Sequence, residues 1–205
     1  MTRHETLEQF AQRVAAAAPT PGGGAVAAVT GALAAALTAM AGRLTPAPEG
    51  QLPPNASRHL VEAADHLSGR LLELAREDEE AYRVVLEARR SGDRVALARA
   101  WRGATRVPAD VVRLCREIAL LALRAAREGP PAAVGDAVMA ALLAAAAAAG
   151  SHLNLGLNLA AAGRPEELLD LADQTAAMLR DTQRAVTEVR LIAEEQLRGG
   201  GERGS

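Results

Sequence analysis

Apolar residues recur every three or four positions along most of this chain, which places them on one face of an α-helix. The segments with this amphipathic pattern are about 6–17, 55–90, 93–127 and 165–197. Two others, about 24–44 and 132–162, are apolar nearly all round, which is typical of helices buried at the centre of a bundle. No segment alternates convincingly with the period of two expected of a half-buried strand. The pattern therefore predicts one short helix followed by about five long ones.

Segments rich in proline and glycine separate these helices, at about 19–24, 45–54, 91–93, 128–131 and 163–165. Long helices joined by short turns pack against their neighbours in an up-and-down bundle. We therefore predict an all-α fold, an up-and-down bundle of about five long helices. Residues 1–198 should form a single domain, followed by a disordered tail at 199–205. Pro108 falls within one predicted helix, where we expect a kink.

The composition limits how such a bundle can pack and what it can bind. Aromatic residues make up only 1% of the 205 residues, namely Phe10, Tyr82 and Trp101, so alanine, leucine and valine must fill the core. Small side chains allow helices to approach one another closely. The formal net charge of −2 predicts no nucleic-acid partner. All 23 cationic side chains are arginine, which excludes a lysine base or a Schiff-base lysine.

The single cysteine and the apolar stretches indicate the cell compartment in which the protein is expected. Cys115 has no second cysteine to pair with inside the chain, which fits a reducing cytoplasm. The polar N-terminal residues predict no signal peptide. The apolar stretches 25–40 and 137–149 fall short of the roughly 20 residues that span a membrane. We expect a cytoplasmic protein with no membrane partner.

A run of proline and glycine precedes the first apolar helix. Its sequence is Pro19-Thr20-Pro21-Gly22-Gly23-Gly24. Neither residue type suits a helix interior, so the helix should begin at about the last of these glycines. A glycine backbone at a helix N-terminus leaves N–H groups and the positive end of the helix dipole open to a ligand. This stretch predicts a place to hold an anion or a polarised carbonyl group.

Two carboxylates interrupt apolar helix faces and are candidate acid or base groups. Asp78 lies on the apolar stripe of its predicted helix, and Tyr82, four residues later, shares that face. A solvated acid within the charged run 77–80 is the alternative interpretation. Asp136 stands in the first turn of the helix at 132–162, where an ordinary helix cap is the alternative. Because a buried polar group must be paired or functional, both acids are candidates.

Asn154 and Asn158 lie four residues apart on an otherwise apolar helix, so their amides share a face. Two amides in that position predict a ligand site or a seam between subunits. Arg43, at the end of the helix at 24–44, is either solvated or paired with a carboxylate. The four histidines show no metal-ligand spacing, and no phosphate-binding loop or dinucleotide fingerprint occurs. We expect no metal and no nucleotide cofactor.

Several segments, in this order, resemble motifs of the cyclodeaminase/cyclohydrolase family. That family comprises bacterial methenyltetrahydrofolate cyclohydrolases and the C-terminal domain of formiminotransferase-cyclodeaminase. The resembling stretches are PTPGGGAVAA from Pro19, AMAGRLT from Ala39, DEEAY from Asp78, VP from Val107, GD from Gly135 and GSHLNLGLNL from Gly150. Together they extend over nearly the whole chain.

The resemblance implies a helical homodimer with a tetrahydrofolate derivative bound as substrate. It implies a folate site lined by the glycine turn, the two acids and the asparagines. Asp78 and Asp136 are the candidate catalytic residues. The candidate substrate-binding residues are Pro21, Gly22, Gly23, Gly24, Arg43, Tyr82, Asn154 and Asn158. A methenyl carbon is an amidinium-like electrophile, so attack by water needs a base and a carboxylate to hold the cation, a role open to either acid.

The implied activity is that of a cyclohydrolase, which converts methenyl-tetrahydrofolate and water to 10-formyl-tetrahydrofolate. The first alternative is a cyclodeaminase, which converts formimino-tetrahydrofolate to methenyl-tetrahydrofolate and ammonia; the lack of a fused formiminotransferase domain favours the cyclohydrolase. The second is a non-catalytic helical dimer that retains the fold and a ligand pocket. Two departures from the family pattern support that alternative: residues 46–54 lack the family's lysines, and Gly135 replaces its serine.

Overall fold

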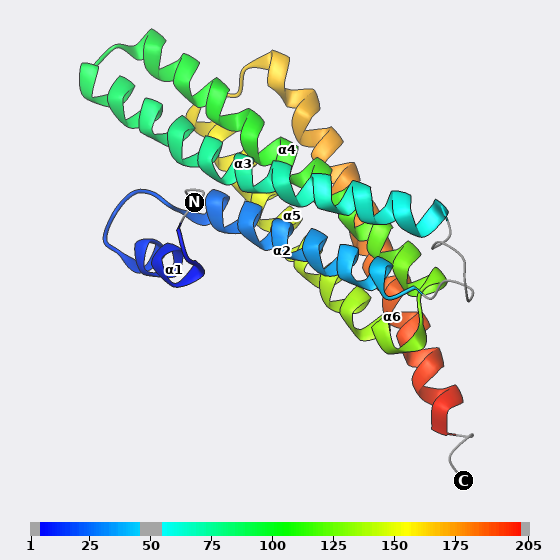
Figure 1. The fold of residues 1–205 in the computed structure, drawn as a ribbon. Coiled ribbons are helices and arrows are strands. Elements are labelled where there is room, and N and C mark those ends of the chain that lie inside the picture. Colours follow the sequence, from blue (N-terminus) through cyan, green and yellow to red (C-terminus); the bar gives the residue numbers. More distant parts are fainter. Residues whose placement is uncertain (1–4, 46–54, 202–205) are drawn as a thin grey trace.

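The computed structural model describes residues 5–45 and 55–201, and within these the fold is all-α, as predicted. The helices are α1 (Leu7–Ala15), α2 (Gly23–Arg43), α3 (Asn55–Ser91), α4 (Arg94–Glu128), α5 (Val134–Ala161) and α6 (Leu169–Gly201), with short 3₁₀ turns at Pro131–Ala133 and Glu166–Leu168. The five long helices that the sequence predicts are thus α2 to α6, and the short first helix is α1. The long helices run side by side, and α1 lies beside the start of α2 (Figure 1).

Helix α4 contacts four of the other helices in the described part of the chain. It packs against α2, α3, α5 and α6, while α2 also packs against α3 and α5. The C-terminal part of α6 extends beyond the other helices (Figure 1). This arrangement places the start of α2 between α3 and α5, where the candidate site lies.

Alanine fills the centre of the bundle, as the composition predicts. Residues such as Ala28, Ala35, Ala140 and Ala144 are fully buried on α2 and α5. The helices are close enough that a Cβ added to Gly31 would lie 2.9 Å from Sγ of Cys115 on α4. Burial in this apolar surrounding raises the pKa of the Cys115 thiol to about 12. The cysteine is therefore a packing residue in its thiol form.

Local signals in the sequence explain where the helices begin and end. Thr6 caps α1 in a reciprocal pair with Gln9, and the Asp93 carboxylate accepts hydrogen bonds from the first turn of α4. Helix α4 continues through Pro108, which lies in its interior as the sequence places it. Helix α6 extends to Gly201, into the stretch where we expected a disordered tail; residues 202–205 lie outside the described residues.

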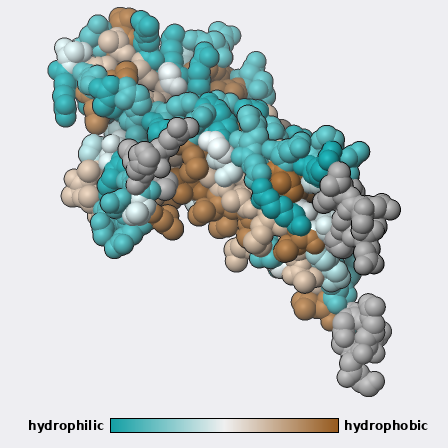
Figure 2. Space-filling view, viewed as in Figure 1, coloured by the Kyte–Doolittle hydropathy of each residue, from teal (hydrophilic) through white to brown (hydrophobic). Residues whose placement is uncertain are grey.

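Two helices keep an apolar face exposed. The large side chains on this face, which we call the α2/α5 face, are Leu33, Met40, Met139, Leu142, Leu153 and Leu157. Figure 2 shows apolar side chains gathered in this part of the molecule, beside the polar surface of α3. The stretches Gly23–Arg43 and Pro131–Ala161 are long and apolar enough to cross a membrane by length and composition alone. The expectation that both are too short was wrong, because the helices have 21 and 28 residues.

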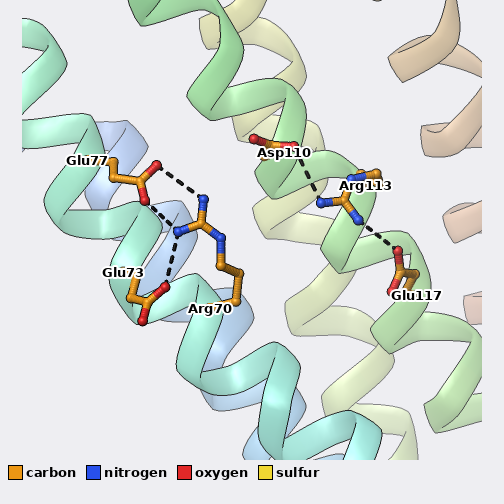
Figure 3. A network of polar contacts seen from close by, with 6 residues as sticks. All are labelled: Arg70, Glu73, Glu77, Asp110, Arg113 and Glu117. Atoms are coloured by element: carbon orange, nitrogen blue, oxygen red, sulfur yellow. Dashed lines mark hydrogen bonds and ion pairs between the residues drawn. The ribbon is translucent and has the colours of Figure 1, made fainter.

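The outer faces of α3 and α4 are polar instead. Arg70 bonds Glu73 and Glu77 along α3, and Arg113 pairs in the same way with two acids of α4 (Figure 3). These pairs lie on the protein surface, where each adds about 0.5 kcal/mol or less. They keep this side of the bundle charged and engage arginines within their own helices.

Candidate functional site

The site is built around a carboxylate that lies on bare backbone at the start of α2. A Cβ added to Gly24 would lie 2.1 Å from Oδ1 and 2.5 Å from Cγ of Asp78. Only glycine permits this approach, because real Cβ atoms essentially never come within 3.0 Å of another group. The Asp78 carboxylate accepts a hydrogen bond from the backbone N–H of Ala25. The glycine turn therefore receives an acid of the protein itself at its open N–H groups.

The surroundings of Asp78 change its acidity. Removal from water raises the pKa of this carboxyl from 3.8 to about 6, and the hydrogen bond from Ala25 partly opposes the rise. The negative charge of Glu79 adds a smaller upward contribution to the pKa of Asp78. A carboxyl with a pKa near 6 is mostly ionised at neutral pH and is still basic enough to take a proton. Asp78 thus has the acidity expected of a general base.

A cavity of about 170 Å³ opens beside this carboxylate. The residues that line it are Pro19, Thr20, Gly22, Gly23, Gly24, Asp78, Ala81, Tyr82, Ala104, Asn154 and Asn158. They come from the turn before α2, from the middle of α3, from α4 and from the C-terminal half of α5. Segments far apart in the sequence thus meet at one end of α2.

Two amides on α5 face the cavity. Nδ2 of Asn158 donates a hydrogen bond to the backbone carbonyl of Ala104, at 3.0 Å. Nδ2 of Asn154 would lie 3.6 Å from a Cβ added to Gly23, so this side chain reaches the glycine turn. Among the described residues, Asn154 makes no hydrogen bond through its side chain. Its donor and acceptor groups are available to a ligand.

One aromatic pair closes a further side of the cavity. The ring of Tyr82 meets the ring of Trp101 edge to face, with centroids 6.1 Å apart and planes at 69°. Such pairs stabilise by about 1 kcal/mol beyond the area they bury, which fixes the position of the tyrosine ring. Tyr82 therefore presents a held ring one turn along α3 from Asp78.

Most of the predicted site residues meet here, and some do not. Gly22, Gly23, Gly24, Asp78, Tyr82, Asn154 and Asn158 line the cavity. Pro21 is buried in the same turn and is preceded by a cis peptide bond, but it is not among the lining residues.

Arg43 and Asp136 lie elsewhere in the chain's fold. Arg43 ends α2, about 30 Å along the helix from Gly23, and pairs with Asp65 at 2.5 Å. Asp136 is in the first turn of α5, about 27 Å along that helix from Asn154. Within one chain, the structure does not bring either residue to the cavity.

Sequence reasoning missed the small residues and the backbone groups of the site. The methyl side chains of Ala81 and Ala104 line the cavity, and the Ala104 carbonyl is the partner of Asn158. Every residue carries a backbone carbonyl, so the sequence does not reveal which carbonyl will bind a side chain unless its usual helical hydrogen bond is prevented. His152, near the asparagines in sequence, instead lies 3.0 Å from Oγ1 of Thr175 on α6.

The side chains suit an organic ligand. Within the described residues, no cluster of three His, Cys, Asp or Glu side chains gathers as metal ligands do. The cavity instead combines one carboxylate, two amides and the backbone of a helix N-terminus. These groups can bind a flat, hydrogen-bonding ring with a positive charge near Asp78.

Comparison with known proteins identifies the family. The formiminotransferase-cyclodeaminase family model matches residues 6–177. A methenyltetrahydrofolate cyclohydrolase of Methylorubrum extorquens is 32% identical, with 77% of this chain and 81% of that protein covered. A crystal structure of a formiminotetrahydrofolate cyclodeaminase from Thermotoga maritima superposes with a TM-score of 0.78 at 29% identity, covering 96% of this chain and 97% of that one. The chain belongs to the formiminotransferase-cyclodeaminase family, as its motifs predict.

Proposed function

We propose that this protein is a methenyltetrahydrofolate cyclohydrolase, which adds water to methenyl-tetrahydrofolate and yields 10-formyl-tetrahydrofolate. The observation that carries the proposal is the Asp78 carboxylate, held on the bare backbone of Gly24 at the edge of a cavity. The similarity to the Methylorubrum extorquens cyclohydrolase supports the same reaction.

Asp78 supplies the base that this reaction needs. The substrate carries a positive charge shared between its methenyl carbon and two nitrogens, and the carboxylate offsets that charge. As the water oxygen bonds to the methenyl carbon, Asp78 takes a proton from the water, and the C=N electron pair returns to nitrogen. The hydroxyl of this adduct then loses its proton as the C=O bond forms and the bond from the carbon to N5 breaks. N5 takes up one proton, and the formyl group remains on N10. One proton is released overall.

The remaining groups of the cavity bind and orient the substrate. Asn154 and Asn158 offer amide donors and acceptors to the edge of the pterin ring. The ring of Tyr82 offers an apolar surface beside it. Glycines at the start of α2 allow the substrate to approach the backbone closely.

A cyclodeaminase activity is the second candidate, and one observation favours it. The Thermotoga maritima cyclodeaminase shares the fold over almost the whole of both chains. In that reaction N10 attacks the formimino carbon, and ammonia leaves after taking a proton. The protonated form of Asp78, which is well populated near pH 6, could supply that proton.

We further propose that a second copy of this chain covers the α2/α5 face and that the protein is cytoplasmic. Six large apolar side chains exposed on two adjacent helices support the homodimer. The single, buried Cys115 supports a reducing compartment. Sedimentation at several concentrations tests the dimer, and a monomer at all of them would refute it.

The experiment that tests the activity follows the absorbance of the methenyl chromophore with and without enzyme. Loss beyond the spontaneous rate supports the cyclohydrolase, and Asp78→Asn should remove that excess. With no acceleration by folded protein, the cyclohydrolase proposal fails. The cyclodeaminase is then tested with formimino-tetrahydrofolate as the substrate. In that assay the absorbance of the methenyl chromophore should appear as ammonia is released.

A further inference from the structure

Helix α4 contains a proline, Pro108, in its interior. Pro108 has no N–H, so the carbonyl of Ala104, four residues earlier, cannot receive its usual helical hydrogen bond. The proline ring also crowds that carbonyl and turns it away from the helix axis. A free carbonyl is therefore expected one turn before Pro108, although α4 continues through the proline.

The free carbonyl has a partner on another helix. Nδ2 of Asn158, on α5, donates to the oxygen of Ala104 at 3.0 Å. Both residues line the cavity beside Asp78. Because a carbonyl can only accept, this bond determines which end of the Asn158 amide is nitrogen.

The bond also determines what Asn158 offers to a ligand. With one N–H of Nδ2 held by Ala104, the amide cannot turn over, so Oδ1 is fixed as its acceptor and the second N–H points in a fixed direction. An acceptor in this position suits an N–H donor, such as the ring amide or amino group of a reduced pterin. Asn154, which makes no hydrogen bond through its side chain among the described residues, keeps both of its roles.

We propose that Pro108 is a positioning residue of the folate site: it frees the Ala104 carbonyl, which orients Asn158 to accept a hydrogen bond from the substrate. The identity of the ligand rests on the proposed function, whereas the orientation of Asn158 does not. The interior proline, which the family resemblance includes in the pair Val107-Pro108, thereby acquires a role in binding.

The test is Pro108→Ala, which restores an N–H at position 108 and returns the Ala104 carbonyl to the helix. Two effects are expected, a more stable fold and weaker binding of the substrate. The melting temperature should rise, because alanine suits a helix interior far better than proline. The KM for methenyl-tetrahydrofolate should rise roughly 3- to 10-fold, the effect of one misplaced hydrogen bond, with kcat within about twofold. A purely structural proline would not combine a more stable protein with weaker binding.

A measurement without substrate keeps this test separate from the proposed function. In the NMR spectrum of the free protein, the Asn158 side-chain amide protons, assigned by their loss in Asn158→Ala, should exchange slowly with solvent. Pro108→Ala should accelerate that exchange about 10-fold or more, in proportion to the lost bond. Unchanged exchange would overturn the inference. If the wild-type enzyme proves inactive while exchange responds as expected, only the proposed function fails.

Two further variants make the test specific. In an Asn158→Ala background, Pro108→Ala should leave KM unchanged, and a rise of KM there would overturn the inference. Asn158→Asp leaves α4 intact but replaces the donor to Ala104 by an acceptor, so it should raise KM at least as much as Pro108→Ala does. The matched control is Pro165→Ala, a proline removed before the 3₁₀ turn Glu166–Leu168 and outside the cavity, for which KM should stay within twofold.

Discussion

Gly24→Ala is the most direct test of the site, because a single methyl group enters the space of the proposed base. The added Cβ would lie 2.1 Å from Oδ1, 2.5 Å from Cγ and 2.6 Å from Oδ2 of Asp78. Contacts below 3.0 Å are not sustained, so the carboxylate must retreat by roughly 1 Å. That retreat also weakens the hydrogen bond from the N–H of Ala25.

The size of the effect follows from that displacement. A misplacement of about 1 Å in a reacting group costs on the order of 100-fold in rate. We therefore expect kcat/KM of Gly24→Ala to fall about 100-fold, equivalent to about 2.7 kcal/mol of transition-state stabilisation. The fold should persist, because alanine favours the first turn of α2 over glycine by up to about 1 kcal/mol.

A helical glycine outside the cavity provides a matched control. A Cβ added to Gly69, on α3, would meet nothing within 4 Å, and Gly69 does not line the cavity. Gly69→Ala makes the same chemical change away from the site and should keep kcat/KM within about twofold. Both variants are assayed by loss of the methenyl chromophore, with circular dichroism to establish folding. Equal losses in the two variants, or full activity of Gly24→Ala, would refute the proposed position of the base.

Three further predictions concern the polar residues. Asp78→Asn should remove activity yet stabilise the fold. The pKa of Asp78 in the folded protein, about 6, exceeds its ordinary value of 3.8. Its contribution to stability is therefore fully present below about pH 4 and is lost as the pH rises through 6, a loss that the uncharged asparagine avoids. At pH 8 the variant should gain about 2 kcal/mol, after allowance for partial exposure, and no gain in urea unfolding would contradict this. Asn154→Ala should raise KM about 5-fold with kcat little changed; an unaltered KM would place the amide outside the substrate contacts. Asp136→Asn should keep kcat/KM within twofold, and its loss would assign the residue to a site shared with a second copy.

The helices could be predicted from the sequence because their causes are local. Apolar spacing, the cap at Thr6 and the break around Gly92 depend only on neighbouring residues, and the long helices lie close to where these signals place them. Pro108 lies inside α4, which continues on both sides of it, and a kink there stays a prediction.

The site depends on the directions and crossings of helices, which local patterns do not contain. Asp78 and Asp136 were both candidates because each interrupts an apolar helix face, but only Asp78 lies at the same end of the bundle as the glycine turn. The position of each acid along its helix tells which end of the bundle it occupies only when the direction of that helix is known. The contact of Asp78 with Gly24 likewise depends on how closely α3 crosses α2.

The edge-to-face pair of Tyr82 and Trp101 has a spectroscopic consequence. The chain contains a single tryptophan and a single tyrosine, and the tyrosine lines the cavity. Intrinsic tyrosine and tryptophan fluorescence of the protein therefore comes from this one pair, whose tyrosine lines the candidate site and whose tryptophan packs against that tyrosine. A titration with substrate or product can therefore be followed by the emission of this pair without any label.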